Sequence, residues 1–240
     1  MATTGTYSFS VTRDDIIRAA LQDIGVVDST GTVDPYDNTT AAMRLNMIIK
    51  QWATEGFPIW CTATATVNLL QGKQDYTMGP SADIPLPYNP VRIFDIILHN
   101  VSSGADISLI PLAKWDWDML SMKTNAGLVN QYYFEKSIPL STLHVYGNPT
   151  DSTSWQLKVA HQRPLQDISA ATDNFDVPQD FYLALKWSLA EELGFTYSIP
   201  SERLQLIEMK AKRARDEAFA LNQEDTSIYF QVDQRFYGPR

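Results

Sequence analysis

Two acidic residues and two tryptophans alternate in the segment KWDWDM, where Asp116 and Asp118 stand beside Trp115 and Trp117. Paired carboxylates can act as acid and base on a glycosidic bond when they face one cleft at a separation of about 5–10 Å. The indole rings could then serve as platforms for sugar rings. In the alternative interpretation the segment is an amphipathic turn with buried tryptophans and solvated aspartates. The brevity of the motif favours this second interpretation.

Other residue types suited to catalysis or metal binding are few. The histidines His99, His144 and His161 fall in segments predicted to be strands, where single histidines usually pack or face solvent. Three imidazoles that met in space could bind a metal. The single cysteine, Cys61, excludes a cysteine-rich zinc site and an intrachain disulfide. Because motifs for phosphate-binding loops, serine hydrolases and zinc proteases are also absent, we expect no catalytic residue, metal or cofactor.

The charge balance restricts the partners of the chain. The sequence has 19 Lys and Arg against 28 Asp and Glu, a formal net charge of −9. This balance argues against binding nucleic acid through the whole surface, which needs clustered cations. An acidic wall can still let DNA slide past it, because it repels phosphates. The sequence has no run of about eighteen apolar residues, so we expect no membrane span.

One basic cluster lies near the C-terminal end, formed by Lys210, Lys212, Arg213 and Arg215. It could contact an acidic protein partner. It could equally be a solvated helix face, because acidic residues interleave at spacings that pair charges along a helix: Glu208, Asp216 and Glu217. These two interpretations stay open, and a grip on DNA phosphates ranks behind both.

The C-terminal segment SIYFQVDQRFYGPR is an aromatic tail with the alternation of a strand. Its apolar and aromatic side chains are Ile228, Tyr229, Phe230, Val232, Phe236 and Tyr237. The tail could fold back onto strands of its own chain. It could also be an arm that adds to a sheet edge of another subunit or fills a groove of a partner. Uncovered aromatic side chains promote aggregation, so we expect something to bind the tail.

Helices are predicted at both ends of the chain. The first begins at Thr12, which forms a capping-box pattern with Asp15, and ends at Gly25. The second is capped by Asp34, has Pro35 at its first position and ends at Gly56. The predicted apolar stripe of the first helix is Ile16, Ile17, Ala20, Leu21 and Ile24, and that of the second is Tyr36, Met43, Met47, Ile48 and Trp52.

Two more helices are predicted after residue 178. One begins near Pro178, and the other follows Pro200. The apolar stripe of the earlier helix is predicted to be Phe181, Leu185, Leu189 and Leu193, widened by Leu183, Ala184 and Ala190. That of the later helix is predicted to be Leu204, Ile207, Ala211, Ala214 and Ala218.

Between the helical ends the period of the pattern changes from that of a helix to that of a strand. The segment CTATATVNLL alternates strictly, which predicts a half-buried strand. Further strands are predicted around the turn NVSSGAD and in QYYFE, STLHVYG and WQLKVAHQR, with KWDWDMLSMK as one short helix. Five to seven short strands at this spacing indicate a small antiparallel sandwich or barrel.

The order of elements predicts an α+β fold with three parts. The simplest arrangement is a four-helix bundle body built from residues 10–58 and 178–222. A small antiparallel β-sandwich or barrel, residues 60–165, is inserted into it. Residues 223–240 form an extended C-terminal arm.

Four stretches in this order resemble the head-to-tail adaptor family of short-tailed phages, also described as head completion, tail accessory or tubular tail A-like proteins. The first two are DDIIRAALQDIGVV and AAMRLNMIIKQWATEGFPIW, and the others are LLQGKQDYTMG and DVPQDFYLALKWSLAEELG. Together they extend the resemblance over about residues 10 to 222. Their shared order and spacing carry the resemblance more than any single motif does.

The resemblance implies a structural role in the virion. Adaptors of this family form a ring, typically of twelve subunits, that docks under the portal at the capsid vertex. The ring extends the DNA channel and offers a platform to the tail nozzle and fibres, and it is assembled in the host cytoplasm. By this analogy the helix at 200–222 and the tail would face the portal or a neighbouring subunit, with DNA passing through the lumen without specific binding. The alternative function is a tail-associated cell-wall glycosidase, or a carbohydrate-binding tail module.

Overall fold

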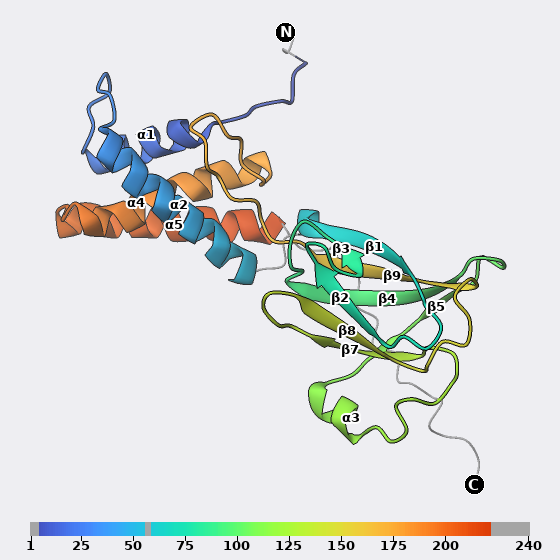
Figure 1. Cartoon of the computed structure of the whole chain (residues 1–240). Helices are drawn as coiled ribbons and strands as arrows, with labels where there is room; N and C mark the ends of the chain where they lie inside the picture. The colour runs from blue at the N-terminus through green and yellow to red at the C-terminus, as the bar shows by residue number, and fades with distance from the viewer. Residues whose placement is uncertain (1–4, 56–58, 222–240) are drawn as a thin grey trace, which may run out of the picture.

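The computed structural model describes residues 5–55 and 59–221, which fold into a helical layer and a β region at opposite ends of the molecule (Figure 1). The helical layer contains α1 (Arg13–Ile24), α2 (Pro35–Glu55), α4 (Tyr182–Thr196) and α5 (Ser201–Leu221). The short helix α3 (Lys114–Met119) lies beyond the sheets, away from this layer (Figure 1). The chain is therefore α+β, and its two sheets dominate the architecture.

Helix α1 begins and ends at the residues that the sequence predicts. The Thr12 hydroxyl accepts a hydrogen bond from the Asp15 backbone N–H, and the Asp15 carboxylate accepts one from the Thr12 backbone N–H at 3.1 Å. This reciprocal pair is a capping box. Gly25 ends the helix in the left-handed conformation, with φ of 82°. The five residues of its predicted apolar face are all buried.

Helix α4 is the centre of the helical layer. Its buried residues are distributed around the whole helix axis: Tyr182, Ala184, Leu185, Ser188, Leu189, Ala190, Leu193 and Gly194. Each of α1, α2 and α5 packs directly against it. A helix that is apolar all round can be stable only when others cover it, and these three supply that cover.

The predicted four-helix bundle body is wrong. In such a bundle, four amphipathic helices direct one stripe each toward a shared axis. Here α4 itself occupies the core, and α1, α2 and α5 surround it. Helix α5 meets α2 through aromatic contacts near one end of the layer, where the rings of Phe219 and Trp52 lie 5.8 Å apart. The all-round apolarity of α4 is the physical reason for the difference.

Helix α2 also departs from the expected pattern. Of its predicted stripe only Ile48 and Trp52 are buried, whereas Tyr36, Met43 and Met47 are 78%, 55% and 60% exposed. The buried face consists instead of Ala41, Leu45, Ile48, Ile49, Trp52 and Ala53. This helix therefore carries two apolar stripes, one facing α4 and one facing outward. In α4, the predicted core residue Leu183 is likewise 53% exposed.

The β region consists of two sheets. The first has four antiparallel strands in the order β1-β9-β4-β5, which are β1 (Thr62–Asn68), β9 (Trp155–Gln162), β4 (Arg92–Asn100) and β5 (Asp106–Ser108). The second has five strands in the order β3-β2-β8-β7-β6, which are β3 (Ile84–Pro85), β2 (Asp75–Gly79), β8 (Ser141–Tyr146), β7 (Gln131–Glu135) and β6 (Ile110–Pro111). The short outer strands β3 and β6 run parallel to their neighbours, so this second sheet is mixed.

The two sheets share one apolar core. The first sheet contributes Ile96, Leu98, Leu157 and Val159, and the second contributes Tyr76, Met78, Leu143 and Val145. All eight side chains have no measurable exposure. Strand β1 alternates as the sequence predicts, with exposed threonines between half-buried Ala63, Ala65 and Val67. Alternate residues of a strand point to opposite faces, so one face of each sheet closes this core.

A polar junction joins the β region to the helical layer. The Arg163 guanidinium forms an ion pair with the Asp176 carboxylate, in which Nη2 lies 2.8 Å from Oδ1. The backbone carbonyl of Asp176 accepts a hydrogen bond from the indole N–H of Trp60. Next to this pair, the Gln162 side chain donates to the carbonyl of Ala53 at the end of α2. These contacts fix the end of β9 against the helices.

Candidate partner-binding surface

A shallow groove of about 300 Å³ opens between α4 and α5, and we call it the α4–α5 groove. Its lining residues are Leu183, Trp187, Lys210, Arg213, Ala214 and Glu217. The wall from α4 is apolar and aromatic, and the wall from α5 is mostly charged. The α5 residues reach the groove together because they recur at three- and four-residue spacings along one helix face.

Two lysines lie over the ring of Trp187. The Lys186 ammonium lies 4.0 Å from the centroid of the indole ring, and the Lys210 ammonium lies 4.5 Å from it. Both distances are within the range of cation–π attraction. Lys186 also pairs with Asp23 of α1 at 2.8 Å, whereas Lys210 forms no ion pair with any residue in the described ranges. The groove therefore presents an aromatic surface beside a cation that has no carboxylate partner within residues 5–55 and 59–221.

The remaining charges of the groove belong to an ion pair on α5. Arg213 Nε lies 2.8 Å from a Glu217 carboxylate oxygen, four residues further along the helix. Both side chains are largely exposed, at 80% and 60%. Exposed pairs of this kind stabilise a helix only slightly. The pair is thus free to exchange partners when another charged surface approaches.

The structure divides the predicted basic cluster between two sides of α5. Lys210 and Arg213 line the groove, whereas Arg215 is close enough to Glu191 of α4 to interact with its charge. Burial raises the pKa of the Glu191 carboxyl, and the positive charge of Arg215 partly opposes this shift. Lys212 is exposed and follows Lys210 by two residues. At about 3.6 residues per turn, the two side chains therefore leave α5 on different sides. The four residues do not form one continuous patch.

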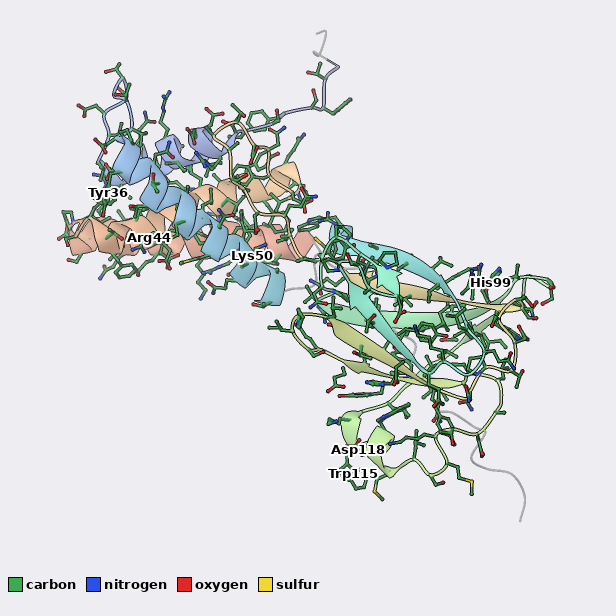
Figure 2. The ribbon with its side chains drawn as sticks, viewed as in Figure 1. Tyr36, Arg44, Lys50, His99, Trp115 and Asp118 are labelled. Carbon is green, nitrogen blue, oxygen red and sulfur yellow. The ribbon has the colours of Figure 1, made fainter. Side chains whose placement is uncertain are left out.

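A second groove, the α2–α4 groove, opens elsewhere on the helical layer. Its volume is about 280 Å³, and its lining residues are Met43, Arg44, Met47, Ile48, Gln51 and Glu192. Arg44 Nη1 lies 3.2 Å from a Glu192 carboxylate oxygen and so bridges the two helices. The two methionines are the outward-facing residues of α2. Figure 2 places Arg44 midway along α2, between Tyr36 and Lys50.

The segment KWDWDM does not form the arrangement that a glycosidase needs. Asp116 and Asp118 lie two residues apart on α3, so they project to different sides of the helix. Asp118 lies 3.8 Å from the Lys114 ammonium. Trp117 packs against the rings of Tyr133 and His144, with centroids at 6.1 and 5.5 Å, whereas Trp115 is 71% exposed. The two indoles therefore do not share one platform.

The three histidines lie in separate surroundings. His99 Nδ1 lies 2.6 Å from Asp106 Oδ1, at the end of the β region that is far from the helices (Figure 2). His144 lies between Asp75 and Glu135, at 2.7 and 3.2 Å. His161 is buried beside Tyr88, and burial lowers the pKa of its imidazole. Among the described residues, no group of three or more His, Cys, Asp or Glu side chains is placed to hold a metal ion.

The predicted tail residues Ile228, Tyr229, Phe230, Val232, Phe236 and Tyr237 lie outside the described residues. None of the helices within the described ranges is both long and apolar enough to cross a membrane.

Comparison with models of known protein families and with curated protein sequences found no match.

Sequence reasoning missed the α2–α4 groove. It assigned Met43 and Met47 to the core, and their exposure leaves an apolar stripe at the surface. A signal was present in the sequence, because Leu45 and Ile49 lie on a second stripe of α2. Two stripes on one helix cannot both face a single neighbour, so one of them had to face outward.

Proposed function

We propose that the chain is a virion structural protein, the subunit of a head-to-tail connector of a bacteriophage. In this proposal, copies of the chain form a ring, typically of twelve, under the portal protein at the neck of the particle. The ring extends the DNA channel and provides the platform on which the tail nozzle and fibres dock. The family resemblance over about residues 10 to 222 suggests this class of protein.

The observation that carries the proposal is the α4–α5 groove. It lies on the helix that the resemblance assigns to portal or subunit contacts, and it combines Trp187 with the cations Lys186, Lys210 and Arg213. Tryptophan and arginine are among the residue types enriched at protein interfaces, and Trp187 and Arg213 supply them here. The groove is shallow and open, as suits a protein surface more than a small molecule.

The charge of the chain agrees with a DNA conduit. A net charge of −9 disfavours adhesion of the DNA backbone, which would slow packaging and ejection. In this proposal, the exposed cations of α5 contact protein and not DNA. The proposal therefore expects DNA to pass through the ring without specific binding.

Mass measurement by light scattering tests the proposal. The full chain, of 27.1 kDa, is measured alone and then mixed with the portal ring encoded in the same genome. We expect association at about one copy per portal subunit, as matched rotational symmetry requires. Absence of association would contradict the connector function. A muralytic assay of the same preparation addresses the glycosidase alternative, and lysis of purified cell wall that Asp116→Asn with Asp118→Asn abolishes would favour it.

The charged residues are tested with a matched pair of variants. Lys210→Gln with Arg213→Gln removes two charges from the groove, and Lys212→Gln with Lys136→Gln removes two exposed charges outside it. We expect the groove variant to weaken assembly on the portal by about tenfold or more, because it loses charge-assisted contacts. Equal weakening by both variants would show that overall charge, and not the groove, drives assembly.

A further inference from the structure

The outer strands of the two sheets differ in how well they are protected from further pairing. Strands β3, β5 and β6 are two or three residues long, and β3 and β6 each end in a proline. Strand β1 also lies at a sheet edge, but it is seven residues long and has no proline, glycine or charged side chain. It pairs with β9 residue by residue, without a bulge. Because short strands, prolines, charges and bulges protect edges, β1 is the unprotected edge among the described strands.

The backbone of β1 points half of its polar groups away from the sheet. Just before the strand, the Cys61 carbonyl accepts a hydrogen bond from the Arg163 N–H at 2.8 Å, and just after it the Leu69 N–H donates to the first residue of β9 at 3.0 Å. Hydrogen-bonded positions alternate along an antiparallel pair, so the odd-numbered residues of β1 bond to β9. The backbone N–H and C=O groups of Thr64 and Thr66 therefore face the open edge, where no other described residue bonds to them.

The side chains of β1 leave an unfinished apolar surface at the same edge. Ala65 and Val67 pack against the shared core but stay half-buried, whereas their partners on β9, Val159 and Leu157, have no exposure. A further strand would cover the half-buried pair by placing apolar side chains on the same face. Its alternate side chains would lie on the outer face beside the exposed threonines. The edge therefore fits an uncharged segment that alternates apolar and polar residues.

The C-terminal tail has this alternation. In an extended chain, Ile228, Phe230 and Val232 lie on one face, and Tyr229 and Gln231 lie on the other. All five side chains are uncharged, like those of β1. Aromatic and β-branched side chains stabilise a sheet when they pair across strands, and tyrosine and threonine would pair on the outer face here. The other segments outside the described residues, 1–4 and 56–58, are too short to supply such a strand.

The end of α5 lies next to the start of β1 (Figure 1). The ring centroids of Phe219 and Phe181 are 5.6 Å apart, and those of Phe181 and Trp60 are 4.9 Å apart. Trp60 stands two positions before the first residue of β1. The residues between Leu221 and Ile228 can span about 20 Å when extended. The tail of the same chain can therefore reach this edge without crossing the molecule.

We propose that residues 227–233 add to the open edge of β1 in their own chain, as a fifth strand of the first sheet. Because the tail starts beside the beginning of β1, the added strand runs parallel to it, as β3 and β6 run parallel to their neighbours. In this pairing Tyr229 lies beside Thr64, the Phe230 N–H donates to the Thr64 carbonyl, and the Phe230 ring covers Ala65.

The added strand has two consequences. It covers the edge at which copies of the chain would otherwise pair and aggregate. It also withholds the aromatic tail from any partner until the strand is displaced from β1. The inference concerns a single chain, so it holds or fails independently of the connector function.

Cross-linking in the full chain tests the pairing. Thr64→Cys with Tyr229→Cys is treated with a short bismaleimide, and linked peptides are identified by mass spectrometry. Ser108→Cys with Tyr229→Cys is the matched control, because Ser108 is exposed on β5 at the opposite edge of the same sheet. The native Cys61 is fully buried, so it contributes little background. We expect the link in the first variant and none in the control.

Isotope labelling shows which chain supplies the tail. Chains labelled with heavy nitrogen are mixed with unlabelled chains before the cross-linker is added. We expect every linked pair of peptides to carry one label only. Pairs that join a labelled to an unlabelled peptide would overturn the proposal, because the tail would then belong to a second copy. Equal linking of both variants, or none in the first, would also overturn it.

Hydrogen exchange measures the backbone pairing without a cross-linker. Phe230→Pro removes the N–H that donates to Thr64, and Phe236→Pro places the same substitution outside the paired segment. We expect the first variant to speed amide exchange at Thr64 and Thr66 by about tenfold, as loss of a hydrogen bond allows, with the helices unchanged. The second variant should match the unaltered chain. Equally fast exchange at the two threonines in all three proteins would contradict the added strand.

Discussion

The helical layer and the β region solve the problem of burying apolar surface in different ways. Two sheets place one face each against a shared core, so alternation along a strand decides which side chains are inside. The helical layer surrounds one apolar helix, α4, with three others. Three helices around a fourth leave grooves between them, and both grooves described above open there. The difference teaches that packing helices around a helix leaves the two grooves open beside α4, whereas the two sheets close one face each over a shared core.

The largest expected effect separates the core of α4 from its exposed side. Leu189 has no exposure, whereas Leu183 lies in the α4–α5 groove and is 53% exposed. Leu189→Ala should lower the free energy of unfolding by about 2–5 kcal/mol, because it leaves a cavity. Leu183→Ala should cost less than about 1 kcal/mol. Urea unfolding measures both, and equal losses would contradict the central position of α4.

The next effect concerns the thiol at the boundary between the two regions. Burial raises the pKa of Cys61 to about 11, from an ordinary value near 9.0. Between pH 9 and pH 11, the Cys61 thiol therefore keeps its proton in the folded state and loses it in the unfolded state. The contribution to stability is fully present below pH 9 and is lost as the pH rises from about 9 to about 11, by up to about 2–3 kcal/mol.

Chemical unfolding at several values of pH tests this dependence. Cys61→Ala serves as the control, because it removes the ionising group while keeping a small apolar side chain. The difference in stability between the unaltered chain and this variant should fall as the pH rises from 9 to 11. A difference that stays constant across this range would show that the thiol is not desolvated as the structure describes.

A smaller effect is expected at the polar junction. Asp176→Asn removes the charge that pairs with Arg163, whose guanidinium pKa is raised chiefly by this hydrogen bond. Both side chains are 22% exposed, so we expect a loss of about 1–3 kcal/mol. Asp167→Asn breaks a pair with Lys50 whose acidic partner is 75% exposed, and it should cost under about 1 kcal/mol. Thermal unfolding monitored separately for helix and strand signals would show whether the junction couples the two regions.

The sequence was most informative where a local rule decides the structure. The capping box at Thr12, the left-handed Gly25 and the alternation of β1 depend on neighbouring residues only, and each is confirmed. The strands around the turn NVSSGAD are confirmed as the antiparallel pair β4 and β5 for the same reason. Short-range hydrogen bonds and side-chain alternation can be predicted because they depend only on residues that are close in the sequence.

The sequence was least informative where several elements compete for one core. The bundle was wrong because periodicity cannot say that three other helices would pack around α4. The core stripe of α2 was wrong for Tyr36, Met43 and Met47, since two apolar stripes on one helix look alike before its partners are known. Helix periodicity alone separates Lys210 from Lys212, but which side of α5 lines a groove depends on how α5 crosses α4. Features within one helix or strand could therefore be predicted, whereas the packing of one element against another could not.

Hydrogen–deuterium exchange of the full chain, alone and bound to the portal ring, tests most directly whether the helices carry the binding surface. The account predicts slower exchange in peptides from α2, α4 and α5 on assembly, with the strands of both sheets unchanged. It would be contradicted by protection confined to the β region, for example at α3 and β7, with the helical layer exchanging at the rate of the free chain.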